Sequence, residues 1–508
     1  MNPKQPQTQT SAKTKTDAQR QPNGNKRSPG TGKPGLVGGR PKTGGGFGKK
    51  PGPAAPPRQP WSAREIALDV LTRVETEQAY SNLLLNQALL KHKPDKADAG
   101  LATELVYGTI QRRNTIDYFL DRFVAKGVKK LEPWVRNLLR LSLYQLHYLD
   151  RVPEHAAVNE AVNIAKRRGH AGISGMVNGV LRNVIRRKEE LTVPASLEPV
   201  ARIALEHSHP EWLVADWISR FGTETAERMC RANNEPPSAS VRVNTLKLTR
   251  EELLGRLKAA GCEARPSDVS PAGIVVESGG NMALTPWYVS GELSVQDESS
   301  MLVAEAAQPE PGMQVLDCCA APGGKTSHMA ELMNDRGRIL ACDIHEHKRE
   351  LIAAQAERLS LRCVETKTID ARNLPEALAG TAFDRILLDA PCSGLGVIRR
   401  KPDIKWAKSP GDVAGIAGLQ YELLSGVSSL LAPGGVLVYS TCTVAEEENE
   451  QVVMRFLQEH PEFALSRPPQ SLQDRLPPDS VAPGGTITVL PHQFGSDGFF
   501  IAVLRKRS

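Results

Sequence analysis

Short apolar segments recur between residues 314 and 443, and each is followed by acidic or turn-forming residues. Five segments have the length and composition of buried strands: 314–317, 338–342, 364–368, 383–388 and 436–440. Polar or helical stretches separate them, which predicts a series of β/α units. The residues that follow the strands should then meet at one edge of the sheet, where ligands bind in such folds. We expect regular β/α alternation from Gly291 to the C-terminus.

The preceding residues follow a different pattern. Between residues 61 and 190, apolar side chains such as Ile66 and Val70 recur at helix spacing, and prolines interrupt the pattern. This predicts an all-α domain of five to seven helices. Residues 191–290 combine a linker with helical and strand-like segments, which predicts a small α+β subdomain. An α/β domain is expected at 291–508.

Positive charge is concentrated in the first two regions. Residues 1–60 contain twelve Lys or Arg, one acidic residue, eleven Gly and eleven Pro, a composition that buries too little apolar surface to fold. We expect a disordered basic tail, which either contacts RNA phosphates or is only a solubilising extension. The net charge is +6 for residues 61–190 and −10 for residues 191–508. Basic clusters on the helical domain suit nucleic acid, although a solvated helix face has the same composition.

Cysteine usage and hydropathy limit the class of protein. The eight Cys residues include no C-x-x-C pair, so we expect neither a zinc ribbon nor a disulfide framework, and no metal cofactor. No run of 18 apolar residues occurs, and the N-terminus has no hydrophobic stretch after its Lys residues. These features predict a cytoplasmic protein with no membrane partner.

A candidate ligand loop follows the first strand. Residues 318–326 read Cys-Cys-Ala-Ala-Pro-Gly-Gly-Lys-Thr, and Gly residues at such a turn let ligand atoms approach the backbone. The last three residues imitate a phosphate-binding loop, but that motif requires Gly where Cys319 stands. The next two strands end near Asp343 and Asp370, and Asp343 is well placed to bind ribose hydroxyls. Both acids could merely cap loops. If they bind a ligand, two carboxylates without a phosphate-binding loop favour an adenosyl ligand that is not anionic, and S-adenosyl-L-methionine fits that description.

Two cysteines occupy turn sequences at the same edge of the predicted sheet. The fourth strand leads into Asp389-Ala-Pro-Cys392, and the fifth into Thr441-Cys442-Thr443. Core cysteines are expected among apolar neighbours within strands or helices instead. A thiolate can add to carbon 6 of cytosine, which makes carbon 5 nucleophilic toward a sulfonium methyl group. An acid near N3 of the ring would offset the charge that develops. The two thiols therefore indicate methylation of cytosine at carbon 5.

These segments closely resemble the RNA cytosine-5 methyltransferases of the RsmB/Sun group. The resemblance rests on residues 317–326, 389–394, 401–403 and 440–443, and it extends to 240–244, 294–299 and 497–502. Residues 61–190 resemble the NusB-like RNA-binding domain of this branch. The resemblance implies a multidomain chain with an all-α NusB-like domain, a small α+β (RRM-like) subdomain and an α/β Rossmann-like S-adenosylmethionine-dependent methyltransferase domain.

The resemblance also implies roles for individual residues. Cys442 would be the nucleophile, Cys392 would assist resolution of the covalent adduct, and Asp389 would contact both cofactor and cytosine. DNA cytosine-5 methyltransferases use the Cys of a Pro-Cys pair, here Cys392, whereas the RNA family uses the Thr-Cys site. The positions that correspond to cofactor-binding residues are Cys319, Ala320, Ala321, Pro322, Gly323, Gly324, Lys325, Asp343, Asp370 and Asp389.

The family branch implies 16S ribosomal RNA as the substrate. A cytosine in a loop of the small subunit, presented before full ribosome assembly to a monomeric enzyme, is expected. A loop is a cheaper substrate than a duplex because the target base must be extruded. Two alternatives stay open. One is the same chemistry on transfer RNA, and the other is a NusB-type RNA-binding or antitermination factor that carries an inactive methyltransferase module.

Overall fold

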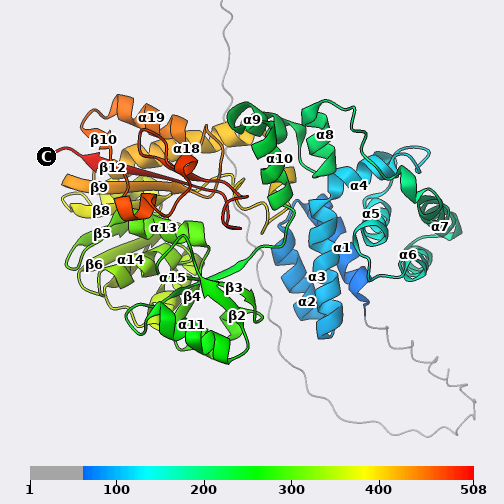
Figure 1. The fold of residues 1–508 in the computed structure, drawn as a ribbon, viewed down its shortest axis with the longest axis horizontal. Coiled ribbons are helices and arrows are strands. Elements are labelled where there is room, and N and C mark those ends of the chain that lie inside the picture. The colour runs from blue at the N-terminus through cyan, green and yellow to red at the C-terminus, as the bar shows by residue number, and fades with distance from the viewer. Residues whose placement is uncertain (1–60) are drawn as a thin grey trace, which may run out of the picture. The chain divides into compact units, whose positions relative to one another are not determined.

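Helices make up the first part of the described chain, and two sheets follow them (Figure 1). The computed structural model describes residues 61–508, so the basic tail expected at 1–60 lies outside the described residues. All the described residues belong to one compact unit. No helix among them is both long enough and apolar enough to cross a membrane.

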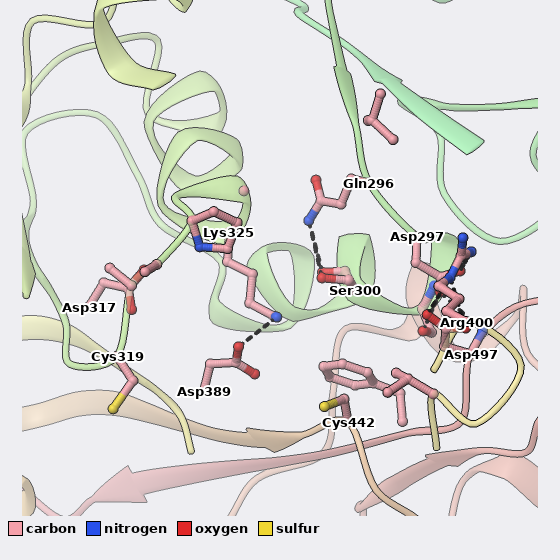
Figure 2. A pocket seen from close by; sticks show the side chains of 18 residues that line it. Gln296, Asp297, Ser300, Asp317, Cys319, Lys325, Asp389, Arg400, Cys442 and Asp497 are labelled. Atoms are coloured by element: carbon pink, nitrogen blue, oxygen red, sulfur yellow. Dashed lines mark hydrogen bonds and ion pairs between the residues drawn. The ribbon is translucent and has the colours of Figure 1, made fainter. Parts of the chain in front are cut away.

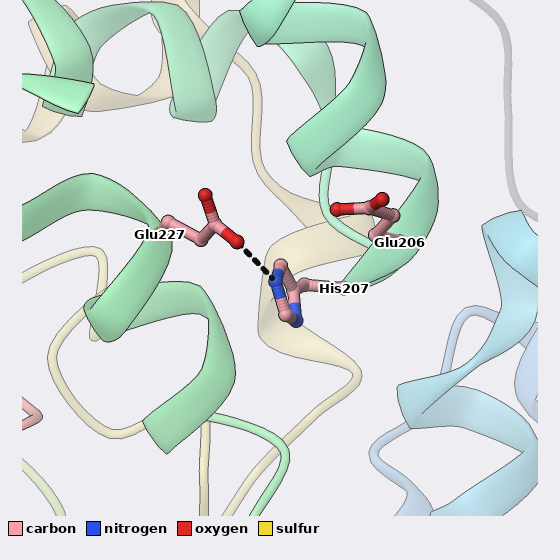
Figure 3. A group of neighbouring side chains, drawn as sticks. All are labelled: Glu206, His207 and Glu227. Carbon is pink, nitrogen blue, oxygen red and sulfur yellow. Dashed lines mark ion pairs between the residues drawn. The ribbon is translucent and has the colours of Figure 1, made fainter. Parts of the chain in front are cut away.

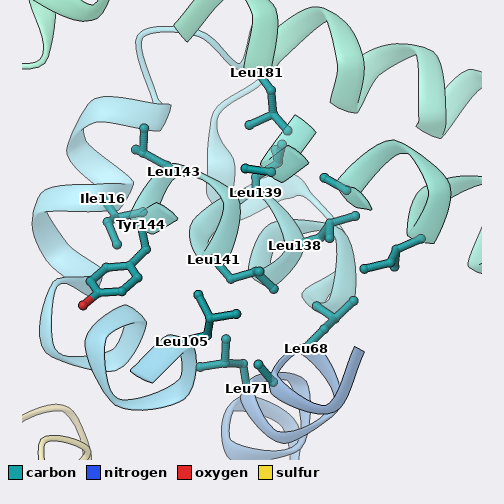
Figure 4. Close-up of a cluster of buried hydrophobic side chains, with 14 of the residues drawn as sticks. Leu68, Leu71, Leu105, Ile116, Leu138, Leu139, Leu141, Leu143, Tyr144 and Leu181 are labelled. Atoms are coloured by element: carbon teal, nitrogen blue, oxygen red, sulfur yellow. The ribbon is translucent and has the colours of Figure 1, made fainter. Parts of the chain in front are cut away.

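Seven α-helices form the first domain, in agreement with the predicted all-α region. They are α1 (Ala63–Glu77), α2 (Ser81–His92), α3 (Lys96–Gln111), α4 (Arg113–Leu120), α5 (Pro133–Tyr148), α6 (Glu154–Arg168) and α7 (Ala171–Arg186). Ser62 begins α1 with a reciprocal capping box to Glu65. Leu138, Leu139 and Leu141 of α5 are buried in a core to which all seven helices contribute (Figure 4). Burying one such leucine stabilises the fold by about 1.5–3 kcal/mol.

Three further helices pack against the large domain. They are α8 (Pro199–Glu206), α9 (Glu211–Phe221) and α10 (Thr223–Ala232). Trp217 of α9 is buried in an apolar cluster that also contains Leu395 and Ile398. Because those two residues follow Cys392 in the chain, these helices support the loop that carries a candidate catalytic thiol.

A four-stranded antiparallel sheet comes next, in the order β2-β3-β1-β4. Its strands are β1 (Ala239–Val243), β2 (Glu263–Pro266), β3 (Gly273–Ser278) and β4 (Leu293–Val295). Leu253 and Leu257 of α11 (Arg250–Ala259) pack into the same core as the strands. The small α+β subdomain is thus present. Its fourth strand lies beyond residue 290, because the chain pairs once more with β1 before it enters the large domain.

The large domain is built on a mixed sheet in the order β10-β12-β9-β8-β5-β6-β7, with β11 paired to β12. Its strands are β5 (Gln314–Asp317), β6 (Arg338–Asp343), β7 (Val364–Thr368), β8 (Phe383–Asp389), β9 (Leu431–Thr441), β10 (Phe463–Leu465), β11 (Ile487–Val489) and β12 (Phe499–Lys506). Its longer helices are α13 (Glu298–Ala307), α14 (Gly324–Leu332), α15 (Glu346–Leu359), α18 (Pro410–Ser428) and α19 (Glu450–Glu459). Strands β5 to β9 are parallel, as their β/α spacing predicts.

The predicted alternation is wrong at the C-terminal end. Strand β12 runs antiparallel to β9 and enters the sheet between β9 and β10. An apolar run looks the same in either direction, so its pattern cannot reveal the direction of a strand. The reversal matters for the site, because Phe500 pairs with Thr441. The start of β12 therefore lies beside the end of β9.

Candidate active site

Two loops meet at the carboxyl edge of the large sheet. Strands β8 and β9 are parallel neighbours, and Asp389 pairs with Ser440 in their register. The residues that follow these strands therefore emerge side by side. The Sγ atoms of Cys392 and Cys442 lie 3.2 Å apart, and both cysteines are free. The two thiols that the sequence places at one edge are in contact.

Glu448 holds the loop that carries Cys392. Its Oε2 atom accepts hydrogen bonds from the backbone N–H of Ser393 (2.8 Å) and from Nε2 of Gln420 (3.0 Å). The Glu448 side chain is fully buried, and burial raises the pKa of its carboxyl group. The loop also needs glycine at residue 396. A Cβ atom there would lie 2.0 Å from the carbonyl oxygen of Gly498, directly before β12. The position of Cys392 is thus set by buried contacts.

Asn449 holds the second loop on both sides of Cys442. Its Oδ1 atom accepts a hydrogen bond from Oγ1 of Thr441 (2.6 Å), and its Nδ2 donates to the carbonyl of Thr443 (3.1 Å). Oγ1 of Thr443 is also hydrogen-bonded to Oγ of Ser393 (2.9 Å). The residue after each thiol is therefore tied to the residue after the other. This fixes the spacing between the two sulfur atoms.

Reasoning from the sequence missed Glu448 and Asn449. They end the run 446–449, Glu-Glu-Glu-Asn, which has the composition of a solvated acidic turn. The structure buries the last two residues completely. Their position a few residues after the motif 440–443 is the one signal in the sequence that could have drawn attention to them.

The two thiols differ in acidity. The hydrogen bond from Cys392 lowers the pKa of Cys442, and the nearby cations Lys325 and Lys401 also lower it, against the effects of burial and of Asp389. The same hydrogen bond, together with burial, raises the pKa of Cys392. Cys442 is therefore the sulfur that favours the thiolate, while Cys392 favours the protonated thiol.

A cavity of about 340 Å³ lies beside Cys442, and we call it the strand-edge cavity (Figure 2). The predicted cofactor positions that line it are Cys319, Ala320, Ala321, Pro322, Gly324, Lys325 and Asp389. Gly323 makes the turn itself, with a φ of +100° that glycine adopts readily and other residues do not. The ligand loop and the thiol thus share one cavity.

Asp317 gives the strand-edge cavity a buried acceptor. Its Oδ2 atom accepts a hydrogen bond from Oγ1 of Thr326 (2.6 Å), whereas no donor in residues 61–508 reaches its Oδ1. Burial raises the pKa of Asp317 to about 7. A cationic ligand in the cavity would stabilise the carboxylate. The cavity therefore fits an adenosyl cofactor that carries positive charge.

Lys325 and Asp389 form an ion pair in the same cavity, with 2.7 Å between Nζ and Oδ2. The other oxygen of Asp389 accepts a hydrogen bond from Oγ of Ser440 (2.9 Å). Burial lowers the pKa of Lys325, but Asp389 and neighbouring groups raise it more, and the net shift is upward. Asp389 therefore joins the ligand loop to the end of β9, directly before Cys442.

Asp343 and Asp370 do not line the strand-edge cavity. Asp343, at the end of β6, accepts a hydrogen bond from the N–H of His345 (3.2 Å). Asp370, after β7, is paired with Arg372 at 2.6 Å. Both acids stand at strand ends, as expected, while their contact with a cofactor is still a prediction.

Arg242 of the small sheet holds the ligand loop from behind. Its Nη1 atom donates to the carbonyl of Gly324 (2.9 Å), and its Nη2 donates to Ser327 (3.1 Å). It also forms an ion pair with Glu331 of α14 at 2.8 Å, and both side chains are almost completely buried. The small subdomain thus supports the start of α14. The sequence reasoning used residues 240–244 only as a resemblance and assigned Arg242 no role.

A second cavity of about 730 Å³ also reaches the thiols, and we call it the interdomain cavity. Residues of α1 to α5 line it on one side, and the segments 392–394 and 401–408 line it on the other. Cys392 borders only this cavity, Asp389 borders only the strand-edge cavity, and Cys442 borders both. The more acidic thiol therefore lies where the two cavities meet.

One cluster in residues 61–508 has the composition of a metal site (Figure 3). It consists of Glu206, His207 and Glu227, with candidate ligand atoms within 4.8 Å of one another. Arg202 already pairs with both carboxylates, at 2.8 Å in the case of Glu227. The acidic charge is thus compensated by an arginine, and the cluster is explained as an ion-pair network between α8 and α10.

Known proteins share these sequence regions and this arrangement. The family model described as 16S rRNA methyltransferase RsmB/F matches residues 304–505, and the NusB family model matches residues 62–186. A model for the ferredoxin-like domain of RsmF/B-like methyltransferases matches residues 209–283. A probable ribosomal RNA small subunit methyltransferase B from Bacillus subtilis (strain 168) is 48% identical over 449 residues, which cover 88% of this chain and 99% of that protein. The chain belongs to the RsmB/F methyltransferase family.

One more curated protein and two solved structures are also similar to this chain. The ribosomal RNA small subunit methyltransferase B of Proteus mirabilis (strain HI4320) is 35% identical over 447 residues, which cover 88% of this chain and 99% of that protein. The crystal structure of PH0851 has a TM-score of 0.72 and 28% identity, and covers 87% of this chain and 99% of its own. The crystal structure of NSun6 from Pyrococcus horikoshii with SFG has a TM-score of 0.53 and 25% identity. The match covers 59% of this chain and 98% of the NSun6 chain.

These matches confirm the resemblance that the motifs indicate. They also confirm the predicted fold class: an all-α NusB-like domain, a small α+β subdomain of ferredoxin-like type, and an α/β methyltransferase domain. The roles of individual residues are not tested by them, and those roles stand as proposals that the geometry supports.

Proposed function

We propose that this RsmB/F protein transfers a methyl group from S-adenosylmethionine to carbon 5 of a cytosine in 16S ribosomal RNA. The observation that carries the proposal is the place of Cys442 at the junction of two cavities, with its sulfur 3.2 Å from that of Cys392. The names of its relatives, ribosomal RNA small subunit methyltransferase B, support the substrate class.

The strand-edge cavity is the proposed cofactor site. S-adenosylmethionine would supply an electrophilic methyl group on a cationic sulfur. Asp317, whose buried carboxylate lies at this cavity, would be stabilised by positive charge on the ligand, and the backbone of residues 319–325 would accommodate the close approach of the ligand. Asp343 and Asp370, at the next two strand ends, are the proposed partners for hydroxyl groups of the ligand.

The interdomain cavity is the proposed cytosine site. The Cys442 thiolate would form a bond to carbon 6, which makes carbon 5 nucleophilic so that it takes up the methyl group. Asp389, beside Cys442, would contact the ring, and a hydrogen bond donated by its acid group to N3 would offset the negative charge that develops there. Loss of the carbon-5 proton would return an electron pair to the ring, restore the double bond and expel Cys442. Cys392 would assist by donating a hydrogen bond to the departing sulfur.

Bisulfite sequencing of total RNA tests the proposal. A strain that lacks the gene should lose one 5-methylcytosine in 16S ribosomal RNA, and the wild-type gene should restore it whereas Cys442→Ala should not. Loss of a transfer RNA modification with ribosomal RNA unchanged would reject the proposed substrate. No loss in either RNA, with RNA binding retained, would favour a binding factor with an inactive module. Methylation of protein-free 16S RNA, and not of assembled subunits, is the result expected if the monomeric enzyme acts before assembly is complete.

A further inference from the structure

The interdomain cavity contains more than a place for one cytosine. At about 730 Å³ it extends from the two thiols to the helical domain. Its wall there includes Tyr80, whose side chain is exposed although it is a large apolar ring (56%). Trp406 contributes a second aromatic ring from the large domain. Aromatic faces at the edge of a cationic cavity are typical of sites for single-stranded nucleic acid.

Arg113 is the most unusual residue of this cavity. It begins α4, and its guanidinium group lies 4.3 Å from the centre of the Trp406 ring. Burial and the nearby charge of Arg140 lower the pKa of Arg113 to about 10, so it stays cationic at neutral pH. Across residues 61–508, no oxygen accepts a hydrogen bond from its side chain and no carboxylate forms an ion pair with it. A half-buried cation without an anion is costly unless a ligand supplies one.

The neighbouring charges of the cavity are already matched. Arg140 forms ion pairs with Asp117 (2.6 Å) and Glu75 (3.1 Å), and Glu75 also pairs with Arg136. Asp117 and Glu75 lie near enough to favour the charge of Arg113, but both are already paired with other arginines and neither forms an ion pair with it. Its positive charge faces a space that ends at the thiols.

The position of Arg113 relative to the thiol loop is set by direct contacts between the two domains. Nε1 of Trp406 donates to the carbonyl of Ile110 (2.8 Å), directly before α4 begins. Oγ of Ser81 donates to Asp403 (2.7 Å), three residues from Trp406. The loop that starts at Cys392 is thus attached to the helical domain, and Arg113 is held close to the path of a substrate.

We infer that Arg113 binds a backbone phosphate of single-stranded RNA next to the target cytosine, and that Tyr80 stacks on a neighbouring base. The inference rests on the proposed function and extends it: the helical domain builds part of the catalytic cavity in addition to gripping RNA elsewhere. Lys401 and Lys408 also line the cavity and form no ion pair within the described residues, which adds to its attraction for phosphate. The guanidinium plane offers two parallel donors to phosphate oxygens.

Fluorescence anisotropy with a labelled single-stranded RNA of about ten nucleotides that contains one cytosine tests the inference in the full-length protein. Arg113→Ala should weaken binding about 10-fold, as expected for the loss of one charge-assisted contact. It should also reduce the magnitude of the slope of log K, where K is the binding constant, against the logarithm of the salt concentration by about 0.7. Arg113→Lys should recover part of the affinity. The matched control is Arg182→Ala, which removes an exposed arginine of α7 that bonds only Asn178 and lies outside both cavities.

The stacking contact is tested in the same assay. Tyr80→Ala should weaken binding several-fold, whereas Tyr80→Phe should not. Circular dichroism and thermal unfolding establish that each variant is folded. Wild-type affinity and salt dependence in Arg113→Ala would overturn the inference, and so would equal losses in Arg113→Ala and Arg182→Ala. Because binding is measured without methyl transfer, a wild-type protein that binds through Arg113 but methylates no cytosine would refute the proposed function alone.

Discussion

The sulfur atoms of Cys392 and Cys442 lie 3.2 Å apart and share a hydrogen bond, which lowers the pKa of Cys442 and raises the pKa of Cys392. This contact makes the two cysteines chemically different although both stand at strand ends of the same sheet. The two shifts favour the thiolate at Cys442 and the protonated thiol at Cys392. The pair therefore predicts opposite results when each cysteine is removed.

Replacing Cys442 with Ala should abolish methyl transfer and leave cofactor binding nearly unchanged. The reason is that this thiol acts on the base, while the ligand loop and Asp317 surround the cofactor cavity. Methylation of RNA with a labelled cofactor and calorimetric binding of S-adenosylmethionine measure the two effects separately. Full activity in this variant would reject Cys442 as the nucleophile.

Replacing Cys392 with Ala should cause a covalent RNA complex to accumulate. Without the neighbouring thiol, the departing Cys442 sulfur loses its hydrogen-bond partner, and the adduct resolves more slowly. Denaturing electrophoresis after incubation with RNA and cofactor detects the complex. The same experiment with Cys392→Ala/Cys442→Ala is the control and should show none. Absence of the complex in the single variant would contradict the role of Cys392 in resolution.

Glu448→Ala should resemble Cys392→Ala. Removing the carboxylate leaves the buried N–H of Ser393 without its acceptor, at a cost of about 1–3 kcal/mol, and displaces the Cys392 loop. The trapped complex should therefore accumulate. Asn449→Ala is the matched variant, and it should reduce formation of the adduct because Asn449 holds the residues on both sides of Cys442. If both variants only lower the yield of folded protein, the two residues have a structural role alone.

Cofactor affinity should rise with pH through about 7. Burial raises the pKa of Asp317 to about 7 in the empty site, and a cationic ligand favours the carboxylate. Below that pH a proton must leave when the ligand binds, so affinity should fall about 10-fold from pH 8 to pH 6. Calorimetry on wild type and Asp317→Asn measures this. Asp497 also has a pKa raised by burial to about 7, and it is present in both proteins, so only the difference between them reports on Asp317. Equal profiles would contradict the prediction.

The ion pair between Arg242 and Glu331 should be essential for stability. Arg242→Met leaves a buried carboxylate without its partner, and such losses cost about 3–5 kcal/mol. Urea unfolding measures the decrease. The double variant Arg242→Met/Glu331→Met removes both charges and should recover much of the loss. Arg73→Met, which breaks an exposed pair with Glu77, should change the unfolding midpoint little. A small effect in Arg242→Met would show that water compensates the buried acid.

The parallel strands and the helical domain could be located from the sequence because burial patterns are local. Strands β5, β6 and β8 each contain an uninterrupted apolar run, since both faces of the sheet are covered by helices, and these runs stand out in the sequence. Strand β12 is equally apolar, but its antiparallel direction depends on pairing with β9. No local pattern records that choice. The fourth strand of the small sheet, only three residues long, carries too little signal to be recognised.

The sequence by itself determined the chemistry available to this protein: two thiols and several acids at strand ends, a glycine turn, and a cationic helical domain. Tertiary structure alone decided which of these groups meet. The 3.2 Å contact between Cys392 and Cys442, the support of their loops by Glu448 and Asn449, and the placement of Arg113 over Trp406 join residues distant in the chain. Such distances depend on strand register and on packing between domains, and these arise from the sum of many contacts that no single motif encodes.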